Sequence, residues 1–67
     1  MKLNEIKVAI AMAKAQLNAF ALCEKAGIQY QTLRRVLKGQ PCKPATAGSI
    51  AAALEVDVEE LIEREGE

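Results

Sequence analysis

Amide and cationic side chains that suit hydrogen bonding to nucleic acid gather in one stretch of the chain, residues 29–43. Gln31 can bond adenine through N6 and N7, and an arginine such as Arg34 can bond guanine through O6 and N7. Lys38 and Lys43 suit phosphate and sugar oxygens, which receive most of the hydrogen bonds between proteins and DNA. These residue types therefore indicate contact with a nucleic acid.

Residues suited to catalysis or metal binding are scarce. The chain has no His, and most of its acids lie after Leu54. Its two cysteines, Cys23 and Cys42, lack the spacing and the His partners of a zinc site. We interpret them as a small buried residue and a loop thiol rather than a disulfide, which fits a cytoplasmic protein. We expect no enzymatic activity, no metal, no cofactor and no small-molecule ligand.

The formal net charge is zero, but the charges are unevenly distributed. Up to Leu54 there are eight Lys and Arg against Glu5 and Glu24, whereas seven acids face only Arg64 afterwards. A basic body with an acidic end is expected when one face of a protein meets an anion. The apolar run of residues 8–13 is too short for a signal peptide or a membrane span. We therefore expect no targeting segment and no membrane partner.

Composition and the residues that start and end helices predict one all-α domain over residues 1–67. A chain this short leaves no room for a second core, and its high alanine content favours closely packed helices. Expected helix starts at Asn18, Gln29 and Asp57 each lie between apolar residues spaced as a hydrophobic staple requires. The weakest of these caps is Gln29, while Asp57 and Glu60 can form a capping box.

The helix ends are also marked. Gly27 and Gly39 suit the left-handed position beyond a helix, and Pro44 can open the next one. Five helices are expected, at about 4–16, 18–26, 29–38, 45–54 and 58–64.

The second and third helices are joined only by Gly27 and Ile28, which predicts a helix-turn-helix unit packed at a steep angle. Helical periodicity turns Leu33, Val36 and Leu37 inward. The opposite side of the same helix is polar, cationic and free of acids; it carries Gln31, Arg34, Arg35 and Lys38.

Two segments resemble the lambda-repressor-like, or Cro/C1-type, helix-turn-helix family. NAFALCEKAGIQYQTLRRVLKGQ resembles its helix-turn-helix, and ALEVDVEELIE resembles the end of its fourth helix and the start of its fifth. The resemblance implies the five-helix repressor domain, a third helix in the major groove, and sequence-specific binding of double-stranded DNA by a transcriptional regulator similar to a repressor.

The same resemblance assigns the candidate base-contacting residues and Lys43, and the chemistry of the neighbouring residues suggests the other contacts. Those matching base-contacting positions are Gln29, Tyr30, Gln31, Thr32, Arg34 and Arg35. Those expected at the DNA backbone are Asn18, Lys38, Gln40, Lys43 and Thr46. Lys43 matches a position that approaches the minor groove, and the free N–H groups near Asn18 and Thr46 can each bind a phosphate.

The sequence departs from the family pattern at several points. Met12 and Leu37 stand where many relatives pair an Arg with a Glu, and a hydrophobic contact can replace such a pair. Glu55 stands where relatives often have Gly, and Ala47 where a larger core residue is common, so the packing around the fourth helix is expected to differ.

The first helix carries more apolar residues than one buried face needs. Val8, Ala11, Met12 and Ala15 supply the expected buried face, and a second stripe consists of Leu3, Ile6, Ile10 and Ala13. Either the helix is rotated or this stripe contacts a partner. A weak homodimer formed on DNA is one hypothesis, with its contact at this stripe or at Val58, Leu61 and Ile62. A protein-interaction module, such as an antitoxin or adaptor, is the alternative function.

Overall fold

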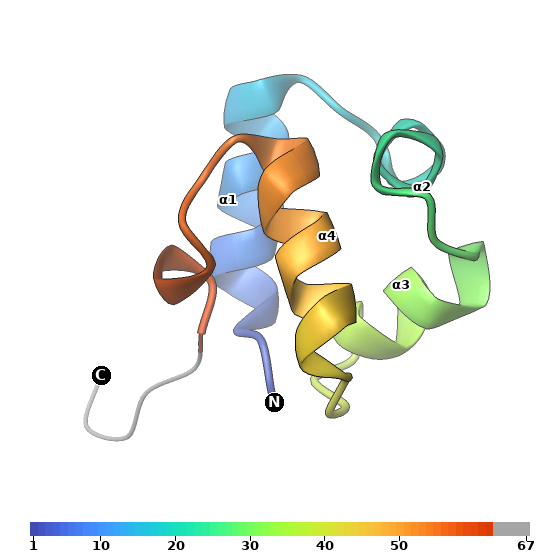
Figure 1. Ribbon diagram of the computed structural model, residues 1–67. Coiled ribbons are helices and arrows are strands. Elements are labelled where there is room, and N and C mark those ends of the chain that lie inside the picture. The colour runs from blue at the N-terminus through green and yellow to red at the C-terminus, as the bar shows by residue number, and fades with distance from the viewer. Residues whose placement is uncertain (63–67) are drawn as a thin grey trace.

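A computed structural model describes residues 1–62, which form four α-helices and one short 3₁₀ turn (Figure 1). The helices are α1 (Glu5–Ala15), α2 (Ala19–Ala26), α3 (Tyr30–Leu37) and α4 (Pro44–Leu54), and the turn is η1 (Val58–Glu60). The prediction of an all-helical fold is confirmed for this part of the chain, and each end of the first four helices lies within one residue of its expected place.

The fifth predicted helix, 58–64, is not confirmed. The predicted capping box is present, because the Asp57 carboxylate accepts from the Glu59 amide at 3.0 Å and Glu60 accepts from the Asp57 amide at 3.2 Å. Only η1 follows it, since Ile62 pairs with Leu3 in an antiparallel bridge that a continuing helix would prevent. Residues 63 and 64 of the predicted helix lie outside the described residues.

The helix caps follow the expected chemistry only in part. Asn4 and Asn18 accept hydrogen bonds from first-turn amides, whereas Gln29 makes no side-chain cap. Gly27, at φ 71°, adopts the left-handed conformation expected of a residue that ends a helix. Two other helices end on left-handed residues that are not glycine, Gln16 and Glu55, each at φ 58°.

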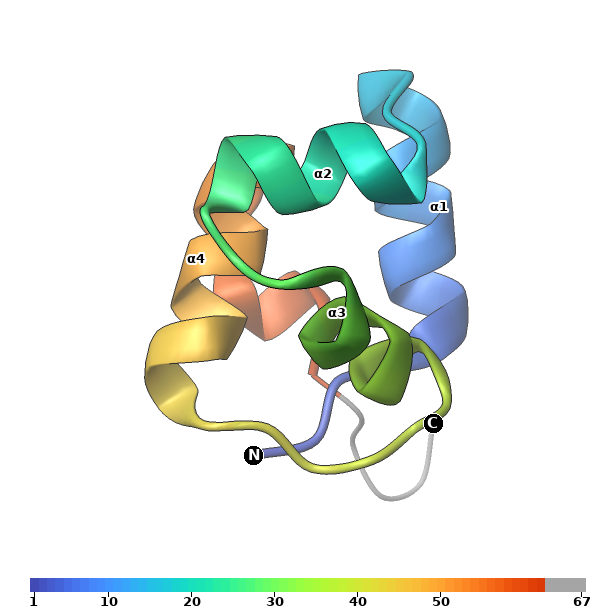
Figure 2. The same ribbon diagram turned by 90° about the vertical axis from the view of Figure 1, so that its right-hand side faces the viewer.

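Four helices enclose one apolar core, with α2 crossing above α3 and between α1 and α4 (Figure 2). The largest fully buried side chains come from every part of the fold: Leu3, Val8, Leu22, Leu33, Val36, Ile50 and Leu61. The small residues Ala47 and Ala51 are also buried on α4, against which α2 packs most extensively. No side chain of a polar or charged residue is buried among residues 1–62, so apolar packing supplies the cohesion.

The packing of α1 resolves its two apolar stripes. Val8 and Ala11 are buried, while Ile6 and Ile10 are 65% and 51% exposed, so the helix is not rotated. The assignment of Leu3 to the outer stripe was wrong. Leu3 precedes the helix, where extended backbone turns its side chain into the core, and it is 1% exposed.

Residues 1–4 fasten two distant segments, and we call them the N-terminal clasp. The Asn4 amide donates to the Leu61 carbonyl at 2.7 Å, beside the bridge between Leu3 and Ile62. Farther along, the Cys42 amide donates to the Met1 carbonyl at 2.7 Å, and the Met1 amino group donates to the Cys42 carbonyl at 3.0 Å. The clasp thus joins the loop after α3 to the segment after η1.

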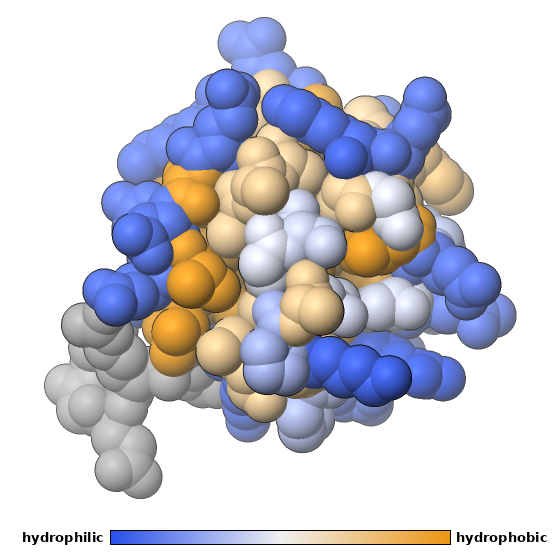
Figure 3. Space-filling model, in the orientation of Figure 1, coloured by the Kyte–Doolittle hydropathy of each residue, from blue (hydrophilic) through white to orange (hydrophobic). Residues whose placement is uncertain are grey.

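The surface over α4 carries pale, weakly apolar side chains, with strongly hydrophobic ones on either side and hydrophilic ones toward the edges of the view (Figure 3). This fits the sequence of α4, which contains no charged residue. No single helix in residues 1–62 combines the length and apolarity needed to cross a membrane; α1 and α2 meet that criterion only together, across a bend of 89°.

Candidate nucleic-acid interface

The two sides of α3 differ as the periodicity predicted. Leu33 and Val36 are buried, and Leu37 is half-buried against the core. The predicted site residues lie on the other side: Gln29, Tyr30, Gln31, Arg34, Arg35 and Lys38 are exposed, and Thr32 is half-buried. The core contacts therefore fix the orientation of the helix and leave its polar side chains in solvent.

The turn between α2 and α3 holds this orientation. The amides of Gly27 and Ile28 both donate to the Cys23 carbonyl, at 2.9 and 3.1 Å, which closes the end of α2. Ile28 is partly buried against the core, and α2 packs on both α3 and α4. The steep angle expected of a helix-turn-helix unit is visible in Figure 2, where α3 lies beneath α2.

An open hollow of about 480 Å³ separates α3 from the start of α4. Thr32 and Arg35 line it from α3, and Lys43 and Thr46 line it from the following loop and α4. Two residues expected to contact bases thus share one concave surface with two expected to contact the DNA backbone. We call this surface the α3–α4 hollow; its other lining residues are Val36, Pro41 and Cys42.

The loop that joins α3 to α4 is held at both ends. The Gln40 amide donates to the Arg35 carbonyl at 3.0 Å, while Gly39 adopts a left-handed conformation at φ 82°. Beyond it, Cys42 is paired with Met1 in the N-terminal clasp. Lys38, Gln40 and Lys43 are therefore carried on a fixed loop, which favours their predicted role in positioning a backbone.

Four cations on α3 and this loop, Arg34, Arg35, Lys38 and Lys43, form no ion pair within residues 1–62. By contrast, Lys25 at the end of α2 lies 3.6 Å from Glu55, which caps the far end of α4 from Lys43. Both side chains of this pair are largely exposed, so it adds at most about 1 kcal/mol to stability. Within residues 1–62, the positive charge that forms no ion pair is thus concentrated on the side of α3 and the hollow.

The starts of the helices differ in how much backbone they leave open. At α2, Asn18 Oδ1 accepts from the Ala21 amide at 2.8 Å, so this predicted phosphate contact is also a structural cap. The residues preceding α3 and α4, Gln29 and Lys43, make no such bond. Their side chains are not used in capping, and first-turn amides of both helices lack a side-chain acceptor.

The structure also reveals two candidate residues that sequence analysis missed. Lys2 belongs to the clasp, and its Cε would lie 3.8 Å from a Cβ at Gly39, which brings another cation to the loop. Phe20 is 68% exposed and stacks on Tyr30, with ring centroids 4.8 Å apart and planes 9° from parallel. In the sequence, only the position of Phe20, two residues after the Asn18 cap, could have suggested that it is a candidate residue.

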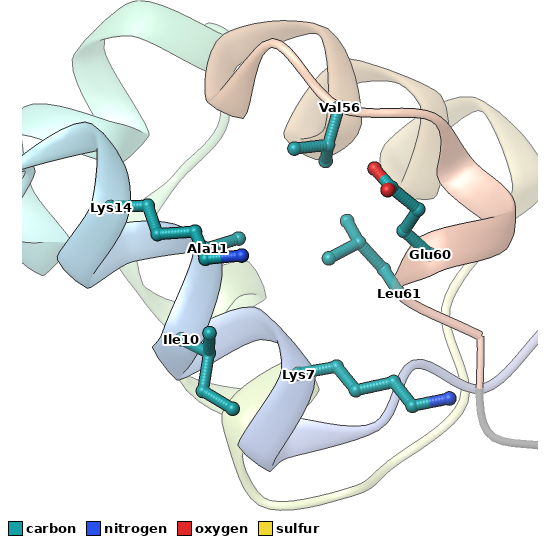
Figure 4. Close-up of a pocket in the computed structure, with 7 residues that line it drawn as sticks. All are labelled: Lys7, Ile10, Ala11, Lys14, Val56, Glu60 and Leu61. Carbon is teal, nitrogen blue, oxygen red and sulfur yellow. The ribbon is translucent and has the colours of Figure 1, made fainter.

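A second hollow, of about 250 Å³, lies between α1 and η1 (Figure 4). Its lining includes the apolar residues Ile10, Val56 and Leu61 and the charged residues Lys14 and Glu60. Glu60 already accepts from the Asp57 amide. In the part of the chain that the structure describes, no cluster of His, Cys, Asp and Glu could hold a metal ion.

Burial distinguishes the two cysteines, both of which are free thiols. Cys23 is buried between helices, and this desolvation raises the pKa of its thiol. Cys42 is half-buried at the α3–α4 hollow. Their interpretation as a small core residue and a loop thiol is confirmed.

Among solved structures, the chain is similar to one segment of longer proteins. PhpD with cadmium atoms matches with a TM-score of 0.84 and 28% identity, and a mutant of hydroxyethylphosphonate dioxygenase with a TM-score of 0.85 and 28% identity. The chain is covered completely in both cases but spans only 15% of each matched chain. No curated protein matches the sequence.

A family model described as the Cro/C1-type HTH DNA-binding domain matches residues 7–67. The match includes the helix-turn-helix of α2 and α3, the α3–α4 hollow and η1, and it confirms the resemblance noted from the sequence. The chain belongs to the Cro/C1-type helix-turn-helix family of DNA-binding domains.

Proposed function

We propose that this protein recognises a specific sequence in duplex DNA by placing α3 in the major groove, and that it regulates transcription as a repressor does. The observation that carries the proposal is the concentration, on α3 and its following loop, of cations that form no ion pair within residues 1–62, together with Gln31. A helix with its side chains is about 10–12 Å across and the major groove about 12 Å wide, so the fit requires little distortion.

Two groups of residues would have different roles, one in contacting bases and the other in contacting phosphates. Gln31, Arg34 and Arg35 present bidentate hydrogen-bonding groups from the exposed side of α3 and would contact base edges. Lys38 and Lys43, on the fixed loop, would hold the phosphates and set the register. The α3–α4 hollow supports this division because Arg35 and Lys43 line the same concavity, so that Arg35 can reach a base edge while Lys43 holds a neighbouring phosphate.

We also propose a weak homodimer that forms on DNA. One recognition helix contacts only a few base pairs, which is too little to select one genomic site. Two subunits on half-sites about 34–36 Å apart would double that information. Sedimentation on a palindromic site checks this proposal, since a one-to-one complex at saturating protein would contradict it.

Selection of bound sequences from a random DNA pool tests the proposed function. We expect enrichment of one short motif, arranged as an inverted repeat. In Gln31→Ala, we expect preference to relax at one base pair per half-site, with a loss of about 1–3 kcal/mol for the preferred base. Absence of any enriched motif, at a salt concentration where the protein binds DNA, would contradict sequence-specific recognition.

A protein-interaction module is the second candidate, and the exposed side of α1 favours it. Glu5, Ile6, Ile10 and Leu37 border an apolar groove there, whose isoleucines are more than half exposed. This function would be favoured by loss of partner binding in Ile10→Asp, together with the absence of salt-dependent DNA binding. A catalytic role is not part of our proposal, because the dioxygenase likeness spans only 15% of those chains.

A further inference from the structure

The stacked pair Phe20 and Tyr30 spans the helix-turn-helix unit on its solvent side. Phe20 lies in the first turn of α2 and Tyr30 is the first residue of α3. They are the only Phe and the only Tyr of the sequence, and they are 68% and 42% exposed. The buried residues of α2 are Leu22 and Cys23. The core therefore does not account for a large apolar side chain at position 20.

Stacking restricts Tyr30 where α3 has the least local support. The cap residue Gln29 makes no side-chain hydrogen bond, so the first turn of the helix lacks that constraint. A ring stacked at 4.8 Å and 9° covers one face of Tyr30 and limits rotation of its side chain. The opposite face and the edge stay available to a ligand, which agrees with the exposure of this residue.

We propose that Phe20 is a positioning residue that holds the Tyr30 ring against the methyl group of a thymine in the major groove. The inference rests on the proposed function, which brings the start of α3 to the bases. Among the major-groove edges of the four bases, only thymine carries an apolar group, its C5-methyl. A flat aromatic surface fixed in place suits that methyl group, since contact removes apolar area from water on both partners.

Replacement of thymine by deoxyuracil, which lacks only this methyl group, tests the inference directly. Each thymine of the selected motif is replaced in turn, and affinity is measured by anisotropy of a labelled duplex. In the unmodified protein, we expect one position per half-site to lose about fourfold in affinity, the value of one buried methyl group. Tyr30→Ala should bind both duplexes equally, and Phe20→Ala should reduce the discrimination to less than about twofold.

Matched variants separate positioning from folding. Glu24→Ala also shortens an exposed side chain of α2, and it should keep the fourfold discrimination. Thermal melts should show Phe20→Ala and Glu24→Ala to be about equally folded, since both changes are at the surface. Because Tyr30 is the only tyrosine and the chain has no Trp, intrinsic emission reports on its ring alone. A change in the intensity of that emission in free Phe20→Ala is the expected sign of lost stacking.

Two results would overturn the inference. One is full thymine discrimination in Phe20→Ala, and the other is equal affinity for thymine and uracil at every position. Failure of the proposed function has a different signature: Gln31→Ala and Arg35→Ala would both retain the affinity and motif of the unmodified protein. In that case α3 would not be the recognition helix, whatever Phe20→Ala shows.

Discussion

Removal of the Lys43 charge is expected to make DNA binding less sensitive to salt. Each phosphate neutralised adds about −0.9 to the slope of log affinity against log salt, because bound counterions are released. A cation held in the groove displaces condensed counterions whether it bonds a base edge or a phosphate, so each of the four interface cations is counted as cancelling about one phosphate charge. These four cations, which form no ion pair within residues 1–62, predict a slope of about −3.6 per subunit, and Lys43→Ala should bring it to about −2.7. Between 50 and 200 mM salt, affinity should fall about 150-fold for the unmodified protein and about 40-fold for the variant.

The assay is fluorescence anisotropy of a labelled duplex at four or more salt concentrations. Lys25→Ala is the matched control, because it removes the same charge at the opposite end of α4, where Lys25 pairs with Glu55. Its slope should stay at about −3.6. If both variants flatten the slope equally, the slope reports net charge and the assignment of Lys43 to a phosphate is wrong. A wild-type slope near zero would refute DNA binding through these cations.

Three further outcomes are expected. Gly27→Ala should lower the free energy of unfolding by about 1–2 kcal/mol, because φ is 71° there. Gly48→Ala lies inside α4 with open space around it and should raise the free energy of unfolding by about 0.5–1 kcal/mol. Thermal melts that show both variants stabilised, or both destabilised, would contradict the backbone argument. Leu3→Ala should lower the free energy of unfolding, measured by chemical denaturation, by about 2–5 kcal/mol. Ile6→Ala should change it by less than about 0.5 kcal/mol. Equal losses of stability in the two variants would show that Leu3 is not a core residue. Alkylation of Cys42, which lines the α3–α4 hollow, should be slowed by bound operator DNA, and unchanged modification rates would place the DNA elsewhere.

Features encoded by local sequence could be predicted, and those made by distant pairing could not. The exposed and buried sides of α3 follow from helical periodicity, so Gln31 and Arg35 were placed correctly from Leu33 and Val36. The position of Leu3 depended instead on a bridge to Ile62, far along the chain. The same bridge stops a helix from continuing after η1, whereas a capping box marks only where a helix begins.

The left-handed conformation of the residues that follow α1 and α4 escaped prediction for a different reason. Gln16 and Glu55 adopt the left-handed conformation, which costs a side chain about 1–2 kcal/mol, and neither residue type signals it. The resemblance to the family hinted at Glu55, where relatives often have Gly. Nothing in the sequence hinted at Gln16. The roles of the candidate site residues remain predictions, because exposure and proximity show what can reach DNA and not which base each residue contacts.

If Lys43 binds DNA as proposed, the N-terminal clasp would link DNA binding to the ordering of residues 1–4. Its hydrogen bonds join residues 41 positions apart at Met1 and Cys42, and its loop-closure cost exceeds that of the contacts within the helix-turn-helix unit. The block of α2, α3 and α4 can therefore assemble while the loop that carries Lys43 is still unpinned. DNA that engages Lys43 in its pinned position binds the clasped form in preference to the open one. If DNA binds as proposed, each bound operator would by mass action shift the equilibrium toward the clasped chain, and amide exchange at Asn4 and Cys42 is expected to slow with it.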